Sequence, residues 1–239
     1  MARIQNYFER RFRFLLASLR VQDTDHGLQT LRNAASLLRE REKIPASLAL
    51  ARIHAELCRC VPPRTPMPTH FMCDAGLGGL ARWLRAAGYD AAWQPEWDDA
   101  GIIRETRRRG ATLITTDTLM MERGVLRDRI VPAIWVPPTV ETEEQLALVF
   151  AEMGLELRVP RCMKCGGELK PVSKEAVAAR IPPKTFRWRD QFFLCARCDQ
   201  LFWLGTHWGK IQQRLKKLAP TELPELRRLR TDLGLKSQT

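Results

Sequence analysis

The sequence has no apolar run that approaches the ~18 residues needed to cross a bilayer, so no membrane partner is expected. Its first residues lack an apolar segment followed by a small-residue cleavage site, so we expect a cytoplasmic protein. It also lacks a glycine-rich phosphate loop, a dinucleotide-binding fingerprint and a Ser/His/Asp arrangement. The nucleotide-binding and serine-hydrolase classes that carry these motifs therefore have no support in the sequence.

Charge is unevenly distributed along the 239 residues, whose composition is that of a globular protein with 45% hydrophobic and 28% charged residues. The formal net charge of +12 divides into +6 for residues 1–65, −5 for residues 66–157 and +11 for residues 158–239. Two basic segments therefore flank an acidic one. This pattern predicts a polyanionic partner that is held by the ends and acted on in the middle.

Residues 1–65 are expected to form a helical module, with a turn at 23–27 and a third helix from Pro45 to Leu57. A proline-rich stretch at 61–68 predicts a linker after it. The arginines of this module form either a solvated helix face or a contact with nucleic acid. Its helices either cover the core or form a homo-oligomer. The apolar residues at helical spacing are Phe8, Phe12, Leu15, Leu16, Leu19, Leu31, Ala34, Ala35 and Leu38.

Residues 66–157 alternate between strand and helix patterns. Strands are expected at 70–74, 91–93, 111–116 and 130–136, and helices at 77–87, 100–109, 118–123 and 142–153. Strictly alternating elements of this kind favour a mostly parallel sheet with helices on both faces. The sequence therefore predicts an α/β fold for this segment.

Four aspartates occupy positions that a parallel sheet would bring to one edge. Asp74 and Asp117 each follow a predicted strand, and Asp98 and Asp99 precede a predicted helix. Clustered carboxylates favour Mg²⁺ or Mn²⁺, which can activate water for hydrolysis of a phosphodiester. Each acid taken alone could instead be a helix cap, Asp99 in particular.

The seven cysteines include two Cys-x-x-Cys pairs, which in a reducing compartment indicate metal before disulfide. Cys162, Cys165, Cys195 and Cys198 are the expected ligands of one tetrahedral, structural Zn²⁺. The glycines at 166–167 and Asp199 suit the tight turns of such a site. We expect a zinc ribbon at 158–218, followed by a tail at 219–239 that is a short helix or frayed.

The insert between the cysteine pairs interleaves basic and aromatic residues. Arg187 and Arg189 flank Trp188, with Lys184 and Phe186 just before them. This arrangement suits either stacking on unpaired bases with phosphate contacts or packing of the aromatic face on the ribbon.

Five separated motifs occur in order at 71–90, 98–99, 113–117, 161–169 and 203–208. Together, over roughly residues 69–216, they resemble the Mut7-C RNase domain, a PIN-like nuclease fold with a zinc ribbon. The resemblance implies a ribonuclease dependent on Mg²⁺ or Mn²⁺, with Asp74 and Asp117 as catalytic acids and Asp98 or Asp99 as the acid between them. Residues 1–65 lie outside the resemblance.

The resemblance also bears on residues around these motifs. Thr116 stands where the family usually has an arginine, and Glu122 or Asp128 is either the fourth acid of a PIN domain or a solvated charge. His207 falls in the family's Gly-Ser/Thr-His-Trp motif and either meets a phosphate or is structural. We include His207 and Arg82 of the first motif among the expected RNA contacts.

Two other functions remain open. One is a non-catalytic adaptor that binds RNA or a ribonucleoprotein and has a degenerate acid site. The other is a toxin-type PIN nuclease.

Overall fold

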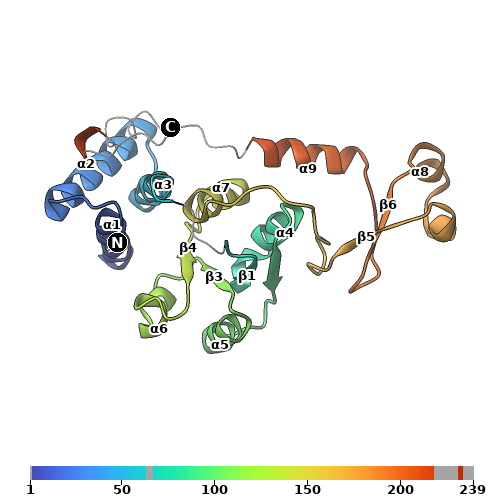
Figure 1. Cartoon of the computed structure of the whole chain (residues 1–239), viewed down its shortest axis with the longest axis horizontal. Coiled ribbons are helices and arrows are strands. Elements are labelled where there is room, and N and C mark those ends of the chain that lie inside the picture. Colours follow the sequence, from blue (N-terminus) through green and yellow to red (C-terminus); the bar gives the residue numbers. More distant parts are fainter. Residues whose placement is uncertain (1, 63–66, 218–230, 234–239) are drawn as a thin grey trace.

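The computed structural model describes residues 2–62, 67–217 and 231–233 (Figure 1). We call α1 to α3 the helical module, β1 to α7 the sheet domain, and residues 161–203 the ribbon. The expected linker at 61–68 falls partly, and the tail at 219–239 mostly, outside the described residues. No helix in the described ranges is long and apolar enough to span a membrane.

The sheet domain contains a four-stranded parallel sheet with the order β2-β1-β3-β4. The predicted α/β fold with a parallel sheet is therefore confirmed. The strands are β1 (His70–Cys73), β2 (Asp90–Trp93), β3 (Thr112–Thr115) and β4 (Ala133–Trp135), and the helices are α4 (Gly78–Ala86), α5 (Asp99–Arg109), α6 (Gly124–Arg127) and α7 (Thr142–Met153).

Helices cover both faces of this sheet because successive strand residues point to opposite sides. Phe71 and Cys73 of β1 pack with residues of α4 and α7, whereas Met72 between them packs with Ile102 of α5 and with the helical module. Figure 1 shows α4 and α7 on one side of the strands and α5 and α6 on the other. The short 3-10 helices η1 (Ala75–Leu77) and η2 (Met120–Glu122) follow β1 and β3.

The helical module consists of α1 (Ala2–Ser18), α2 (Thr24–Glu42) and α3 (Ala46–Cys58). Its apolar stripe is buried against the sheet domain, with the Phe8 and Trp135 rings in an edge contact 5.9 Å apart. The predicted turn at 23–27 is wrong, because Asp23 caps α2 and accepts a hydrogen bond from the His26 N–H. Gly27 instead lies inside α2, where a Cβ would come within 3.1 Å of Leu16.

A second difference follows β3. The expected single helix at 118–123 is replaced by η2 and the separate helix α6, which begins at Gly124. Asp117 accepts a hydrogen bond from the Leu119 N–H and so starts a tight turn where the sequence pattern suggested a regular helix.

The ribbon contains a three-stranded antiparallel sheet, β5 (Leu169–Val172), β6 (Phe192–Cys195) and β7 (Leu201–Trp203), in that order. The insert between β5 and β6 forms η3 (Glu175–Arg180) and α8 (Pro183–Trp188). After β7, α9 (Thr206–Lys216) returns to the sheet domain, where Ile211 and Leu215 join the apolar cluster of α4 and α7. The segment with the family motif around His207 thus belongs to a helix that packs on the sheet domain.

A buried group of charged and polar side chains joins the helical module to α7. Arg11 of α1 donates to Glu152 of α7, and its Nε donates to His54 Nε2 of α3 at 3.1 Å. His54 Nε2 is therefore the acceptor, and Nδ1 faces Glu152 Oε2 at 3.3 Å. Burial lowers the pKa of His54, so this histidine is neutral at pH 7 and the charges of Arg11 and Glu152 balance each other.

We expect Glu152→Gln to lower the free energy of unfolding by about 3–5 kcal/mol, because it leaves the buried Arg11 without its counter-charge. Chemical denaturation at pH 7 measures this loss. Glu144→Gln on the same helix is the matched control, since Glu144 pairs with Arg52 in a more exposed position and its loss should cost less than about 1 kcal/mol. Equal losses for the two variants would contradict the prediction.

Candidate active site and metal centre

The acid edge of the molecule lies at the carboxyl ends of β1 and β3, which are neighbours in the sheet. After β1 the chain crosses to β2 on one side, and it later returns to β3 on the other side of β1. The crevice between two such strands is where open α/β sheets bind their ligands. Asp74 follows β1 directly and Asp117 comes two residues after β3, so both lie at this crevice.

Thr115, the last residue of β3, connects the two acids. Its hydroxyl donates to Asp74 Oδ2 at 2.7 Å and accepts a hydrogen bond from the Asp117 N–H at 2.9 Å. The Thr115 side chain is fully buried, with 0% exposure, so its hydroxyl depends on these partners. Thr115 was not predicted as a site residue, although a hydroxyl-bearing, β-branched residue two positions before Asp117 was a usable signal.

Both acids also accept hydrogen bonds from nearby backbone. Asp74 Oδ1 accepts from the Ala75 N–H and Asp117 Oδ1 from the Leu119 N–H, each at 2.6 Å. In each of these aspartates, one carboxylate oxygen thus binds backbone as the alternative interpretation of a cap predicts, and the other oxygen does not. Asp117 Oδ2 accepts no hydrogen bond from the described part of the chain, so it can bind a ligand.

Asp98 and Asp99 differ in what they contact. The cap of α5 is Asp98 rather than Asp99, and Asp98 Oδ1 accepts a hydrogen bond from the Gly101 N–H at 2.8 Å. Asp99 Oδ2 instead pairs with Arg123 at 3.0 Å, in the segment between η2 and α6 that follows β3. Asp99 is therefore the one of the two that reaches toward the segment carrying Asp117.

The acids approach one edge without forming a complete metal cluster. Within the described ranges, the ligand atoms of the four cysteines all lie within 4.8 Å of one another, as the ligands of one metal ion would. No three of the aspartates in these ranges come together in this way. The two candidates for a fourth acid contact arginines, Glu122 with Arg10 at 2.8 Å and Asp128 with Arg127 at 2.9 Å. The hydrogen bond from Arg127 lowers the pKa of Asp128.

The four cysteines come together as the sequence pattern predicted. The Sγ atoms of Cys162 and Cys198 lie 3.7 Å apart, and those of Cys165 and Cys195 lie 3.4 Å apart. A tetrahedral site with Zn–S bonds of about 2.3 Å places its sulfurs about 3.8 Å apart. The cluster can therefore bind a zinc ion with four sulfur ligands and no open position.

Backbone geometry supports this reading of the cysteine cluster. The N–H groups of Gly167 and Arg197 each donate to a cysteine sulfur at 3.4 Å, and Gly166 and Asp199 have positive φ angles of 78° and 55°. A Cβ at Gly167 would lie 2.7 Å from the Cys195 sulfur, so only glycine fits there. Burial raises the pKa of Cys162 to about 12, so without a metal this thiol keeps its proton at neutral pH.

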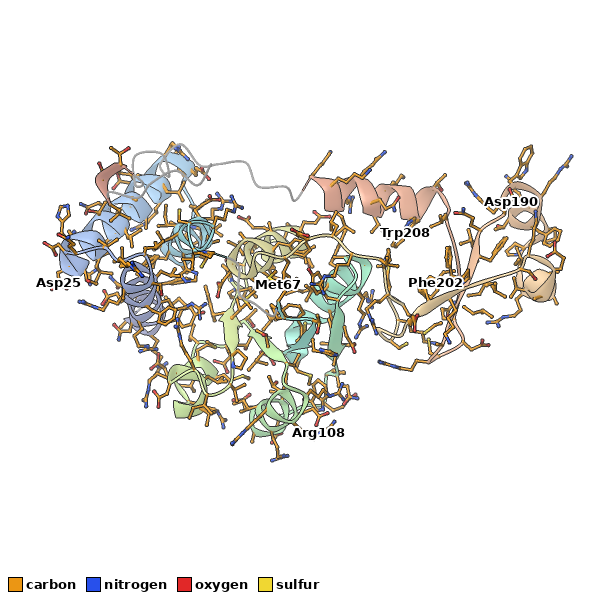
Figure 2. All side chains as sticks on the ribbon, in the orientation of Figure 1. Asp25, Met67, Arg108, Asp190, Phe202 and Trp208 are labelled. Atoms are coloured by element: carbon orange, nitrogen blue, oxygen red, sulfur yellow. The ribbon has the colours of Figure 1, made fainter. Side chains whose placement is uncertain are left out.

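The expected RNA contacts lie on or directly after α8, on α4 and on α9. α8 forms the end of the ribbon farthest from the parallel sheet, and Figure 2 shows Asp190 beside it. On α8, Trp188 is 69% exposed with Arg187 stacked near it, whereas Phe186 packs on the small ribbon core. Arg189 directly follows α8 and is half-buried, Arg82 is exposed on α4, and the side chain of His207 on α9 lies outside the described residues.

Comparison with known proteins supplies the family. Neither a curated protein nor a solved structure matches the chain. The model of the Mut7-C RNAse domain matches residues 69–215, which is more than half of the chain. The match includes the four aspartates of the acid edge, the four clustered cysteines and α9 except its last residue. The chain therefore belongs to the Mut7-C RNAse domain family.

Proposed function

We propose that the protein is a metal-dependent ribonuclease that hydrolyses RNA phosphodiester bonds at the acid edge. Family membership indicates a nuclease-type function. The observation that carries the finer proposal is the Thr115 hydroxyl, which ties Asp74 and Asp117 together at the crevice between β1 and β3. Fixed carboxylate oxygens of this kind suit Mg²⁺ or Mn²⁺.

Asp74, Asp99 and Asp117 are the proposed ligands of the catalytic metal. Asp99 is favoured over Asp98 because it pairs with Arg123, in the segment that follows Asp117. When bound, Mg²⁺ or Mn²⁺ would activate water and offset the charge of the phosphate. Water attack on phosphorus with departure of the 3′ oxygen would leave a 5′-phosphate and a 3′-hydroxyl.

The chain's own residues would orient this reaction. Thr115 holds the Asp74 carboxylate by its hydroxyl, and the backbone N–H of Leu119 holds that of Asp117. Arg123 pairs with Asp99 at 3.0 Å and lies at the acid edge, so it can contact a phosphate of the substrate once Asp99 turns to a metal.

We propose that zinc in the ribbon is structural and that α8 grips RNA. The exposed Trp188 offers a face for an unpaired base, and Arg187 and Arg189 offer charge to its phosphates. His207 and Arg82 remain candidates for further contacts, and RNA is the proposed substrate.

A non-catalytic RNA-binding adaptor is the second candidate function. It is favoured by one observation, that the aspartates of the described chain do not form a group of three within 4.8 Å. Binding of RNA without any cleavage in Mg²⁺ or Mn²⁺ would decide for the adaptor.

Asp117→Asn and Asp74→Asn should each reduce Mn²⁺-dependent cleavage of end-labelled RNA to below about 1% of wild type, because each removes a charged ligand. Thr115→Val, which removes only the hydroxyl that orients both acids, should lose about 10–100-fold. Glu105→Gln is the control, because Glu105 of α5 pairs with the exposed Arg108 and Arg109, and this variant should cleave normally. Full cleavage by a pure Asp117→Asn preparation would refute the assignment.

Cys165→Ser should remove the bound zinc, because three sulfur ligands cannot complete the tetrahedral site. Zinc content measured on purified protein should fall from one ion per chain, and the melting temperature should fall with it. Cys60→Ser is the control, since Cys60 lies on the helical module and contacts the Glu56 carbonyl. Zinc retained at full stoichiometry by Cys165→Ser would contradict a four-cysteine site.

Trp188→Ala should weaken binding of single-stranded RNA by about 1–3 kcal/mol, the contribution of one stacked base. Fluorescence anisotropy with a labelled oligonucleotide measures the affinity. Phe14→Ala is the matched control, because Phe14 is another exposed aromatic side chain with an arginine over its ring, Arg129, but it lies on the helical module. If both variants bind as wild type does, α8 does not grip RNA by stacking.

A further inference from the structure

Arg85 of α4 is a buried arginine that joins the sheet domain to the cysteine cluster. Arg85 is 5% exposed to solvent. Its Nε donates to the Ala91 carbonyl of β2 at 2.7 Å, and its Nη1 donates to the carbonyls of Met163 and Lys164 at 3.0 and 2.9 Å. One guanidinium thus binds an edge strand of the parallel sheet and the turn between the first two cysteines.

Two further arginines bind the next carbonyls of the same turn. Arg197 donates to the Cys165 carbonyl at 2.8 Å and Arg161 to the Gly166 carbonyl at 2.7 Å. Four successive carbonyls, those of residues 163–166, therefore accept from guanidinium groups. A zinc ion with four thiolates carries a net charge of about −2, which three guanidinium groups offset. Arg161 and Arg197 belong to the ribbon, whereas Arg85 belongs to the sheet domain.

The turn also packs directly on β2. A Cβ at Gly166 would lie 3.0 Å from Asp90 Oδ1, at the first residue of that strand. The Arg85 carbonyl accepts a hydrogen bond from the Arg161 N–H at 2.9 Å, so the chain that enters the turn is held at the same place. The shape of the cysteine turn and the position of β2 are therefore fixed together.

From β2 the contacts continue to the acid edge. Trp93, the last residue of β2, donates from its indole N–H to the Ala75 carbonyl at 2.8 Å, and Ala75 directly follows Asp74. The indole lies against Gly78, where a Cβ would come within 2.8 Å of the ring. The turn that holds Asp74 is thus fastened to the same strand that Arg85 holds.

We propose that β2 and the turn that holds Asp74 are well ordered only when the four cysteines bind a metal ion, because Arg85 links the cysteine turn to β2. The metal of the ribbon thereby controls the geometry of the acid edge. Without the metal the cysteine turn is not held in shape, and Arg85 loses two of its three acceptors while it stays buried. Arg85 is a positioning residue in this proposal. The consequence for cleavage rests on the proposed function, whereas the coupling itself does not.

Hydrogen exchange of the full-length protein without RNA tests the coupling. Chelation of zinc from the wild type should raise exchange at residues 75–78 and 90–93 at least tenfold, and should leave β4 unchanged. Arg85→Met should retain its zinc and show this fast exchange even when loaded. Arg161→Met is the matched control, because it removes an equivalent bond to the turn without reaching β2, and it should behave as the wild type.

Arg85→Lys provides a second variant should Arg85→Met not fold. A lysine keeps the charge but has no planar fork to reach Ala91 and both turn carbonyls together, so it should give intermediate exchange. The proposal is overturned if chelation changes exchange within residues 160–205 alone, or if a folded Arg85 variant exchanges as the wild type does. Because no RNA is present, these results stand even if the protein proves not to cleave RNA.

Discussion

Parallel pairing of β1 with both β2 and β3 is the constraint on which the acid edge depends. It places the carboxyl ends of three strands side by side, so that residues from different parts of the chain meet at one crevice. Asp74 and Asp117 are 43 positions apart in the sequence, yet one hydroxyl, that of Thr115, contacts the carboxylate of the first and the backbone of the second. Without the parallel register these contacts could not form.

Apart from the segment after β3, where η2 and α6 replace the expected single helix, the order and type of the elements in the sheet domain could be read from the sequence, because burial on both faces imposes a clear pattern. Asp74 and Asp117 could be found because they follow apolar strands, and Asp98 and Asp99 because they precede a helix. The four clustered cysteines could be found because their spacing is that of a zinc site. Arg85 could not be found, because its role depends on partners that only the folded chain brings near, and for Thr115 the sequence indicates the position but not the two partners of its hydroxyl. Gly27 was misread since glycine at a close helix contact has the same sequence signal as glycine in a turn.

The structure shows which of the basic residues in the two positively charged segments pair with other groups of the protein. Many basic residues of the helical module lie in ion pairs, among them Arg11 with Glu152, Arg32 with Glu9 and Arg52 with Glu144. The pairs of Arg10, Arg11 and Arg52 with acids of the sheet domain offset about half of the net charge of +6 of residues 1–65. In the ribbon, Arg161 and Arg197 bind carbonyls of the cysteine turn, as Arg85 of the sheet domain does, whereas α8 carries the exposed Trp188 and Arg187.

The position of α8 determines how the ribbon could assist the proposed cleavage of RNA at the acid edge. α8 lies at the far end of the ribbon from the sheet (Figure 1), so an RNA held there must extend along the molecule to reach Asp74. Such an arrangement works only if the ribbon keeps a fixed orientation, because a freely hinged arm would not direct the strand to one crevice. The bonds from Arg85 to the cysteine turn and the ion pair of Arg197 with Asp90 of β2 at 3.9 Å hold the ribbon at one point. The packing of Ile211 and Leu215 of α9 on the sheet domain holds it at a second point. The cysteine cluster thus stands where the ribbon joins the sheet domain, next to the bonds from Arg85 that connect the two.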